Sequence, residues 1–599
     1  MLMSVFFAVS FLGVYFAIFL CEKTEKELNG FAWINVTFII TLCYHAFVAG
    51  ILSLISIKVN LLSIGMFDII LCLILMFLYS KKTIRIQRYY FEFRDACIIL
   101  ILLICVVVRF LMQFSTQLNL HYITSDPSVH LFQAMEVINS GRVEKMYFGS
   151  LTNALFMEFM EPFFSGFYVY KSFILMDGIM LFVSGLSFFS VMKQEKNLND
   201  HNKNKLVIPE IILLLMYVLG YPLNNMVFGF VYLGMAVSII ATIIVFTNLY
   251  LQTESRELYY KIALMFLCFG VSISYVLFAP IIYISIFICI SYEILKTQNV
   301  KNWIFSCLKI FLLPCVLTVI YCFFGMFSGN VDSMKTGIQN AGYIYQDIFM
   351  NAWIICFPVL VGLFVSFKRK VISMENVGGG MMAVFAMALG LLTLNGTISP
   401  YYFFKLAYVV SLFLYAFAYQ GVLYWVEDSK ITLWGFCITI VLLFGVFFGR
   451  LEERIAGVIP NFVSYQKIPF YLDIYEFNNQ TIDSEIYSIG KMELYQKIYE
   501  DYNQPTICIG EWLDCYWYEA LTNQRMDQEK YYPWLIDQRQ YWENIAQDKD
   551  IKYLLVLKDS KIYAENNYKF TGLEKEYENE EGIIYAVNDA GRQQLIYGK

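Results

Sequence analysis

The sequence predicts an α-helical polytopic membrane protein that carries a small polar domain at its C-terminal end. The chain has 599 residues, of which 59% are hydrophobic and 15% are charged, and its mean hydropathy is +0.57. Apolar windows of about 20 residues, the length that crosses roughly 30 Å of hydrocarbon, recur as far as residue 449. Strands of a transmembrane barrel would be about 10 residues long with alternating polarity. The windows therefore indicate helices.

About fourteen spans are predicted within a membrane domain of residues 1–450. Lysine and arginine near span ends mark the cytoplasmic side, and Lys81–Arg88 is the strongest basic loop, followed by 193–205 and 367–370. Breaking the apolar run 262–294 near Tyr275 places all three loops on one side. Both termini are then predicted outside. The spans are expected at 3–20, 32–56, 60–80, 96–115, 163–192, 206–221, 226–250, 262–276, 278–294, 303–326, 350–368, 378–394, 402–426 and 431–449.

Residues 451–599 are predicted to form an extracytoplasmic α/β domain. The segments PTICIG, IKYLLVLK and EGIIYAVN have the pattern of buried strands, and YSIGKMELYQKIYEDY and EWLDCYWYEALTN have helical spacing. Tyrosine and tryptophan are frequent here, and such rings either fill a core or stack on sugars. Cys508 and Cys515 lie outside the apolar region, which leaves a disulfide between them open. The net charge of −6 argues against a nucleic-acid partner.

Ionisable residues inside apolar segments are costly and mark either function or a compensating partner. His45 and Asp68 lie near mid-depth on consecutive spans and are predicted to satisfy each other, and Asp177 is expected to be neutral or paired. Arg109 and Lys405 lie toward the outer ends of their spans. Two interpretations remain open for these cations: they extend to the membrane interface, or they hold a phosphate of a lipid carrier.

The first long outer loop, 116–162, contains the string HYITSDPSVHLFQAMEVINSG. Asp126 is expected to cap a short helix, with Pro127 at the first helical position and Gly141 as its C-terminal stop. His130 follows Asp126 by four residues, so the two side chains are expected on one edge of the first turn. An acid and an imidazole placed together can share a proton, bind a divalent ion or hold a hydroxyl group. Capping and chemistry remain open as roles for Asp126.

The acidic string SDPSVH in the first outer loop, the many spans and the polar outer C-terminal domain together resemble the GT-C superfamily of integral membrane glycosyltransferases. The segment NGTISPYYFFKLAY resembles a later outer turn of these enzymes, and the similarity covers roughly residues 60–450. The chain departs from some members because it has no Trp-Trp-Asp motif and no Asp-Glu or Asp-Asp pair in the first loop. Substrate and metal dependence are therefore left open.

The resemblance implies transfer of a sugar from a polyprenyl-(pyro)phosphate carrier to a cell-surface glycan or cell-wall polymer, at the outer face of a bacterial cytoplasmic membrane. It implies that Asp126 is the general base, with His130 as its partner and a possible ligand of Mg²⁺ or Mn²⁺. Arg109 and Lys405 would stabilise the departing lipid phosphate. The alternatives are a transporter or flippase for lipid-linked sugars, a polysaccharide polymerase, and a non-catalytic assembly protein.

Four further residues are candidates for this site. Glu158 and Glu161 in MEFMEPFF are possible second acids, although an interfacial amphipathic helix explains them as well. Tyr401 and Tyr402 either line the cavity or anchor their helix at the membrane interface.

Overall fold

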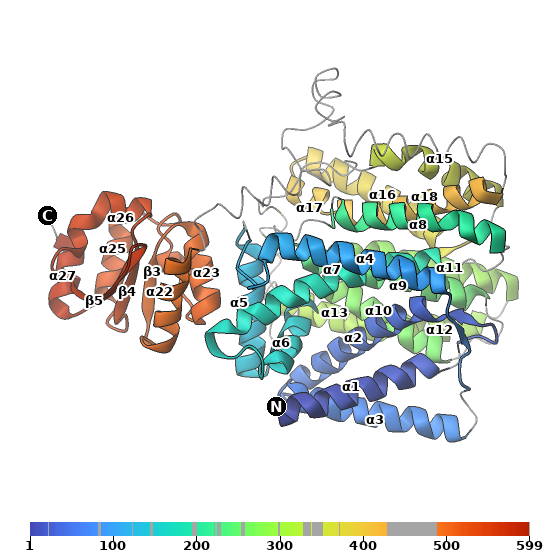
Figure 1. Cartoon of the computed structure of the whole chain (residues 1–599), viewed down its shortest axis with the longest axis horizontal. Helices are drawn as coiled ribbons and strands as arrows, with labels where there is room; N and C mark the ends of the chain where they lie inside the picture. The colour runs from blue at the N-terminus through green and yellow to red at the C-terminus, as the bar shows by residue number, and fades with distance from the viewer. Residues whose placement is uncertain are drawn as a thin grey trace, which may run out of the picture.

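The helical membrane domain and the C-terminal domain are both present in the computed structural model (Figure 1). The expected span 431–449, the boundary at 450, and the segment 327–349 apart from residues 337 and 339 lie outside the described residues. The structure describes residues 1–21, 23–81, 85–122, 124–143, 148–194, 200–220, 222–223, 229–252, 258–297, 300–326, 337, 339, 352–369, 372–427 and 488–597.

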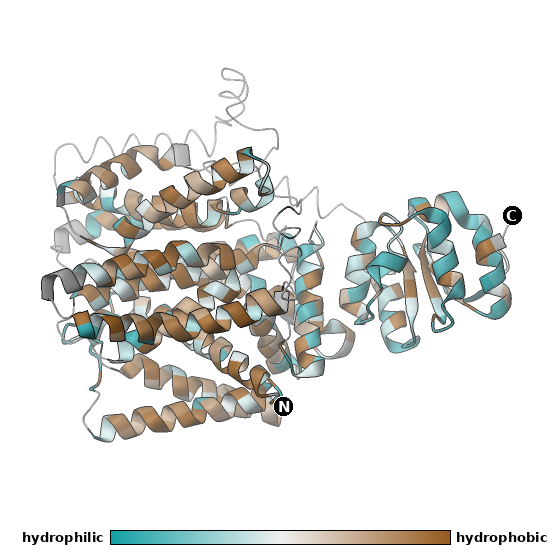
Figure 2. Cartoon of the chain, turned by 180° about the vertical axis from the view of Figure 1, so that it is seen from behind, coloured by the Kyte–Doolittle hydropathy of each residue, from teal (hydrophilic) through white to brown (hydrophobic). Residues whose placement is uncertain are grey.

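Among the described residues, nine helical segments are long and apolar enough to cross a membrane, and three shorter apolar helices accompany them. Figure 2 shows that apolar residues dominate these helices, whereas hydrophilic residues are frequent on the helices of the C-terminal domain. The helices of this bundle are α1 Leu2–Leu20, α2 Gly30–Leu54, α3 Leu61–Ser80, α4 Phe93–Phe114, α7 Tyr170–Met192, α8 Asp200–Leu219, α9 Val231–Gln252, α10 Leu258–Ser274, α11 Ala279–Thr297, α12 Val300–Cys307, α13 Leu313–Thr318, α15 Ala352–Arg369, α16 Met374–Leu394, α17 Pro400–Phe404 and α18 Ala407–Glu427.

Burial divides the bundle into central and peripheral helices. The apolar window of α9 is 94% buried and that of the segment containing α17 and α18 is 89% buried, whereas the window of α1 is 17% buried and that of α3 is 22% buried. A helix that is apolar on all sides is stable either inside a protein or against lipid. The inner helices therefore form the core, and α1 and α3 present an apolar surface suited to lipid tails.

The apolar run 262–294 is broken, as predicted. Helix α10 ends at Ser274, Tyr275 is extended, and a short 3-10 turn, Val276–Phe278, leads into α11. Tyr283 of α11 lies beside Ser272 of α10, with their hydroxyl oxygens 2.7 Å apart, and its hydroxyl also donates to the Cys268 carbonyl at 2.9 Å. In a continuous helix, 11 to 15 residues would separate these groups by roughly 16–22 Å. The chain therefore reverses direction at Tyr275.

Two intramembrane acids have the partners that a buried carboxylate needs. The predicted pair of His45 and Asp68 is confirmed, because Nε2 and Oδ1 lie 2.9 Å apart and both side chains are buried. The Tyr122 hydroxyl donates a hydrogen bond of 2.5 Å to Oδ2 of Asp177. Asp177 is therefore paired, and its partner comes from the loop that precedes α5, Asp126–Ser140.

The end of the bundle opposite α5 holds a buried ionic network. Nζ of Lys193, which follows α7, lies 3.0 Å from Asp95 of α4 and 2.7 Å from Glu210 of α8. The Asn29 amide donates to Asp95 at 2.6 Å, and the Tyr419 hydroxyl of α18 donates to Glu210 at 3.0 Å. The network thus joins five helices or their ends.

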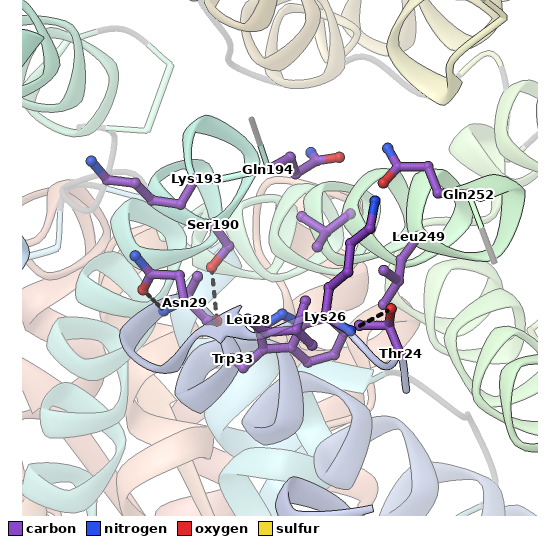
Figure 3. Close-up of a pocket in the computed structure, with 12 residues that line it drawn as sticks. Thr24, Lys26, Leu28, Asn29, Trp33, Ser190, Lys193, Gln194, Leu249 and Gln252 are labelled. Carbon is purple, nitrogen blue, oxygen red and sulfur yellow. Dashed lines mark hydrogen bonds between the residues drawn. The ribbon is translucent and has the colours of Figure 1, made fainter. Parts of the chain in front are cut away.

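A pocket opens beside this network (Figure 3). Asn29, Lys193 and Gln194 line it together with Thr24 and Lys26. The pocket is also lined by β1, Leu28–Asn29, which forms a two-residue parallel pairing with β2, Tyr89–Tyr90. Asp95 of the network lies in the first turn of α4, and the chain continues to α5 from the opposite end of that helix.

The C-terminal domain contains a four-stranded sheet in the order β3-β4-β6-β5. Strand β3, Thr506–Ile509, is parallel to β4, Tyr553–Leu557, and β6, Gly582–Ala586, is antiparallel to β4. The predicted strands and helices are confirmed, the helices being α22, Ile489–Glu500, and α23, Trp512–Thr522. Cys508 and Cys515 are free and buried, so the possible disulfide between them is absent. The other elements are β5 Glu574–Glu578, α24 Gln528–Tyr531, α25 Gln538–Gln547, α26 Lys561–Asn566 and α27 Asp589–Tyr597.

Candidate functional site

Helix α5 crosses the end of the bundle that is nearest to the C-terminal domain (Figure 1). It begins at Asp126, one residue earlier than predicted, so Ser125 is the N-cap residue and Asp126 belongs to the first turn. The expected capping role of Asp126 is therefore wrong. Gly141 ends the helix in the left-handed conformation, with φ of 64°, as predicted. The Asp126 carboxylate lies near the positive end of the helix dipole, which stabilises negative charge.

Lys405 lies at a break between α17 and α18 that the sequence did not indicate. Its side chain is 4% exposed, and its Nζ lies 4.0 Å from the centre of the Tyr401 ring. The same ammonium donates to the Tyr232 hydroxyl at 2.5 Å, and the rings of Phe230, Tyr275 and Tyr402 lie within 6.0 Å. Aromatic faces attract a cation. The ammonium is thus held in an aromatic cluster, unlike a lysine that extends into water.

Tyr401 connects this cation to the predicted acid. Its hydroxyl lies 3.3 Å from Oδ2 of Asp126, to which it donates, while its ring lies against Lys405. The carboxylate and the ammonium therefore lie on two sides of one tyrosine, although the two residues are far apart in the sequence. Of the predicted cavity aromatics, Tyr401 belongs directly to this site, and Tyr402 donates to the Gly337 carbonyl at 2.7 Å.

His130 lies beside both charges, on the same helix as Asp126. Its ring centre is 4.8 Å from that of Tyr232, which accepts the hydrogen bond from Lys405. Burial lowers the pKa of His130 to about 4, with Lys405 lowering it further and Asp126 opposing the shift. The imidazole is therefore neutral near pH 7, and it can accept or donate a hydrogen bond without adding positive charge.

A close backbone approach fixes the start of α5. Gly229, with φ of 73°, lies so near Pro127 that a Cβ atom there would be 2.0 Å from the proline Cγ. Any larger residue would displace the chain that leads into α9, which carries Tyr232. The glycine therefore holds the Asp126 turn against the aromatic cluster around Lys405.

The remaining predicted residues have different surroundings. Arg109 of α4 is 4% exposed, and its role toward a phosphate stays a prediction. Glu158, in α6 (Phe148–Met160), accepts a hydrogen bond of 3.2 Å from the Leu61 backbone N–H at the start of α3. That contact gives Glu158 a structural role, and burial raises its pKa. Glu161 is exposed in the turn that follows α6.

A divalent cation at this site would have few protein ligands. In the part of the chain that the structure describes, no three histidine, cysteine or carboxylate side chains cluster as ligands. Asp126 and His130 supply one oxygen-bearing and one nitrogen-bearing group, and Mg²⁺ usually completes such a set with water and substrate phosphates. Asp126 and His130 therefore fit a metal ion only when a phosphorylated substrate supplies further oxygen ligands.

The C-terminal domain packs directly on α5 through α23. Trp517, which is fully buried, stacks on Tyr122 with ring centres 5.6 Å apart. Tyr122 in turn holds Asp177 of α7, so the stack joins the domain to the bundle. An exposed ion pair of 3.5 Å between Arg525 and Glu136 of α5 adds little, because water screens it. Of these two contacts, the buried ring stack is therefore the stronger.

Glu519 of α23 gives the domain a pH dependence that can be tested. Burial raises the pKa of Glu519 from 4.5 to about 7, and the Met526 backbone N–H, which donates to Oε1 at 2.6 Å, partly opposes this. The folded domain then binds the proton more tightly than the unfolded chain. The free energy of unfolding of the C-terminal domain is therefore expected to fall as the pH rises from about 4.5 to about 7. Above pH 7 it should level off.

We expect Glu519→Gln to raise the melting temperature of the C-terminal domain at pH 8 and to have little effect near pH 4.5, since glutamine resembles the protonated acid. Thermal unfolding of the full-length protein gives the melting temperature, and hydrogen exchange of α23 gives the local stability at each pH. Glu529→Gln, on the exposed helix α24, is the matched control and should change neither value. An equal effect of Glu519→Gln at both pH values would contradict the assigned protonation.

The sequence did not identify Tyr232, Tyr275 and Phe230 as the residues around Lys405. It also did not indicate that helix α23 packs on α5, the helix that carries Asp126. The three aromatic residues lie in apolar stretches and carry no distinguishing pattern, and nothing in the sequence indicates which face of the C-terminal domain meets α5. Comparison of the chain with protein-family models, with curated proteins and with solved structures found no match.

Proposed function

We propose that this protein is a membrane glycosyltransferase that transfers a sugar from a polyprenyl-(pyro)phosphate carrier to a glycan or cell-wall polymer. One observation carries the proposal: a helix-start carboxylate, Asp126, and a buried ammonium, Lys405, lie on two sides of Tyr401 at the end of the bundle that bears the polar domain. Glycosyl transfer needs a base for an incoming hydroxyl and positive charge for a departing phosphate, and these two groups supply both.

In the proposed reaction Asp126 takes the proton from an acceptor hydroxyl as that oxygen attacks the anomeric carbon. The bond between the anomeric carbon and the carrier phosphate breaks, and the phosphate leaves with the bonding electron pair. Lys405, and Arg109 as predicted from the sequence, stabilise the negative charge that develops there. Neutral His130 orients the acceptor hydroxyl. No step in this scheme depends on a metal ion.

The proposed topology has about fourteen spans and places the site and the C-terminal domain on the extracytoplasmic side of a bacterial cytoplasmic membrane. Its support is the basic character of residues 81–88, 193–205 and 367–370, and the chain reversal at Tyr275. Cysteines introduced into 193–205 and 367–370 are expected to react with an impermeant maleimide only after the membrane is permeabilised. Reaction in intact cells would contradict the orientation.

The function is tested by incubating the purified full-length protein with a panel of polyprenyl-phosphate and polyprenyl-pyrophosphate sugars and candidate glycans. Mass spectrometry of the products should detect a new glycosidic bond and free carrier phosphate. The competing class, a transporter of lipid-linked sugars, would instead move the labelled lipid across a vesicle membrane without forming a bond. Transport without transfer would overturn the proposal.

A further inference from the structure

Helix α23 and the segment after α24 present a continuous set of aromatic rings on the C-terminal domain. The ring centres of Trp512 and Tyr516 lie 6.4 Å apart, those of Tyr516 and Tyr532 lie 5.3 Å apart, and those of Tyr532 and Trp534 lie 4.6 Å apart. Tyr532 is fully buried, whereas Trp512 is 45% exposed and Trp534 is 40% exposed. The buried Tyr532 thus contacts Trp534 directly and is connected to Trp512 through Tyr516, and both tryptophan rings face solvent.

Two of these rings lie on α23, which packs against the helix that carries Asp126. Tyr516 lies on α23, the helix that packs on α5. Burial raises the pKa of Tyr516, and the carboxylates of Glu519 and Asp126 raise it further. The set therefore runs from the helix that packs on α5 onto the exposed surface of the domain.

We propose that Trp512, Tyr516 and Trp534 form an acceptor platform that binds an uncharged sugar ring of the glycan and directs its hydroxyl group toward Asp126. This inference rests on the proposed function. Sugar rings present an apolar C–H face that fits an aromatic surface, and their hydroxyl groups reach polar groups at the rim. The acids next to the platform in sequence, Glu511 before Trp512 and Asp537 after Trp534, are exposed and disfavour an anionic ligand.

The rigid mounting of the platform supports a binding role. Trp517, one residue beyond Tyr516, is fixed by its stack on Tyr122, so rotation of α23 relative to α5 is resisted. The Glu511 side chain also accepts from the Lys561 backbone N–H at 2.8 Å, which ties the start of α23 to α26. A pre-positioned aromatic surface binds with a smaller entropic loss than a mobile one.

The test uses the full-length protein in nanodiscs and measures binding of uncharged hexasaccharides of glucose, mannose and N-acetylglucosamine by saturation-transfer NMR. At least one is expected to bind, and Trp512→Ala with Trp534→Ala should weaken its binding at least about tenfold, as for truncation of an aromatic anchor. Trp512→Ala alone provides a milder variant. Tyr568→Ala removes an exposed ring elsewhere on the same domain and should leave binding unchanged.

The outcomes separate the platform from the proposed reaction. Binding that persists in Asp126→Asn and is lost in the tryptophan variants supports the platform, even if the wild-type protein transfers no sugar. If the wild-type protein transfers sugar but the tryptophan variants keep its KM for the acceptor, the platform is refuted while the function stands. Failure of all three uncharged hexasaccharides to bind, or stronger binding of a hyaluronan hexasaccharide, also refutes it.

Discussion

Replacing Asp126 with asparagine is expected to reduce sugar transfer by about 10²- to 10⁴-fold, the usual contribution of a positioned general base. Asparagine has nearly the same shape, and its side-chain oxygen can still accept the hydrogen bond that the Tyr401 hydroxyl donates to Asp126. The substitution therefore removes the ability to take a proton while keeping the contacts around the start of α5. The loss is expected in kcat, with little change in KM for the lipid-linked donor.

Glu136→Gln is the matched control for this substitution. Glu136 lies on the same helix, and its contact is an exposed ion pair with Arg525, so its replacement should leave transfer and folding nearly unchanged. Both variants are measured in the transfer assay, with hydrogen exchange of α5 as a check on folding. Full activity of Asp126→Asn would refute the catalytic assignment, although the fold would be unaffected.

The sequence predicts the membrane domain well where a long apolar window crosses the bundle. The break near Tyr275 is predicted from the charge of the loops instead, because hydropathy alone averages over many residues and does not register a single turn. Lys405 shows this: the window 402–426 predicts one span, whereas the structure ends α17 at Phe404 and begins α18 at Ala407. Strand β5 was missed for a different reason. It lies at the edge of the sheet, so its mostly exposed and charged residues have no buried face to create an alternating pattern.

The candidate site was predictable only in part. The sequence spacing of Asp126 and His130 predicts that both side chains lie on one edge of the same helix, since a helix places residues four apart side by side. Lys405 could be singled out because a charge in an apolar segment is costly. The proximity of Tyr401 to both Asp126 and Lys405 depends on the packing of distant helices, and no local rule supplies that information. The aromatic cluster around Lys405 could not be predicted from the sequence for the same reason.

A second large effect is expected at the opposite end of the bundle, where Lys193→Met should destabilise the protein by about 3–5 kcal/mol, as when one partner of a buried ion pair is removed. The Lys193 side chain is 7% exposed, and those of Asp95 and Glu210 are 0% and 3% exposed. Methionine fills the space but removes the cation that the two buried carboxylates share, and Asp95 then keeps only the longer contact of 3.8 Å to Arg94 among its described ion pairs. The expected result is a marked loss of folded protein, measured as the detergent-extracted yield that remains monodisperse and as the melting temperature.

The destabilisation should come from the uncompensated carboxylates and not from lost packing. Adding Asp95→Asn and Glu210→Gln to Lys193→Met is therefore expected to recover much of the melting temperature, because the neutral amides can still accept from Asn29 and Tyr419, as the two acids do. Lys171→Met is the matched control, since Lys171 lies at the start of α7, the helix that Lys193 follows, against the ring of Tyr168. If the triple variant melted as low as Lys193→Met alone, the network would be holding α4, α7 and α8 together through the lysine side chain itself, and the electrostatic explanation would be wrong.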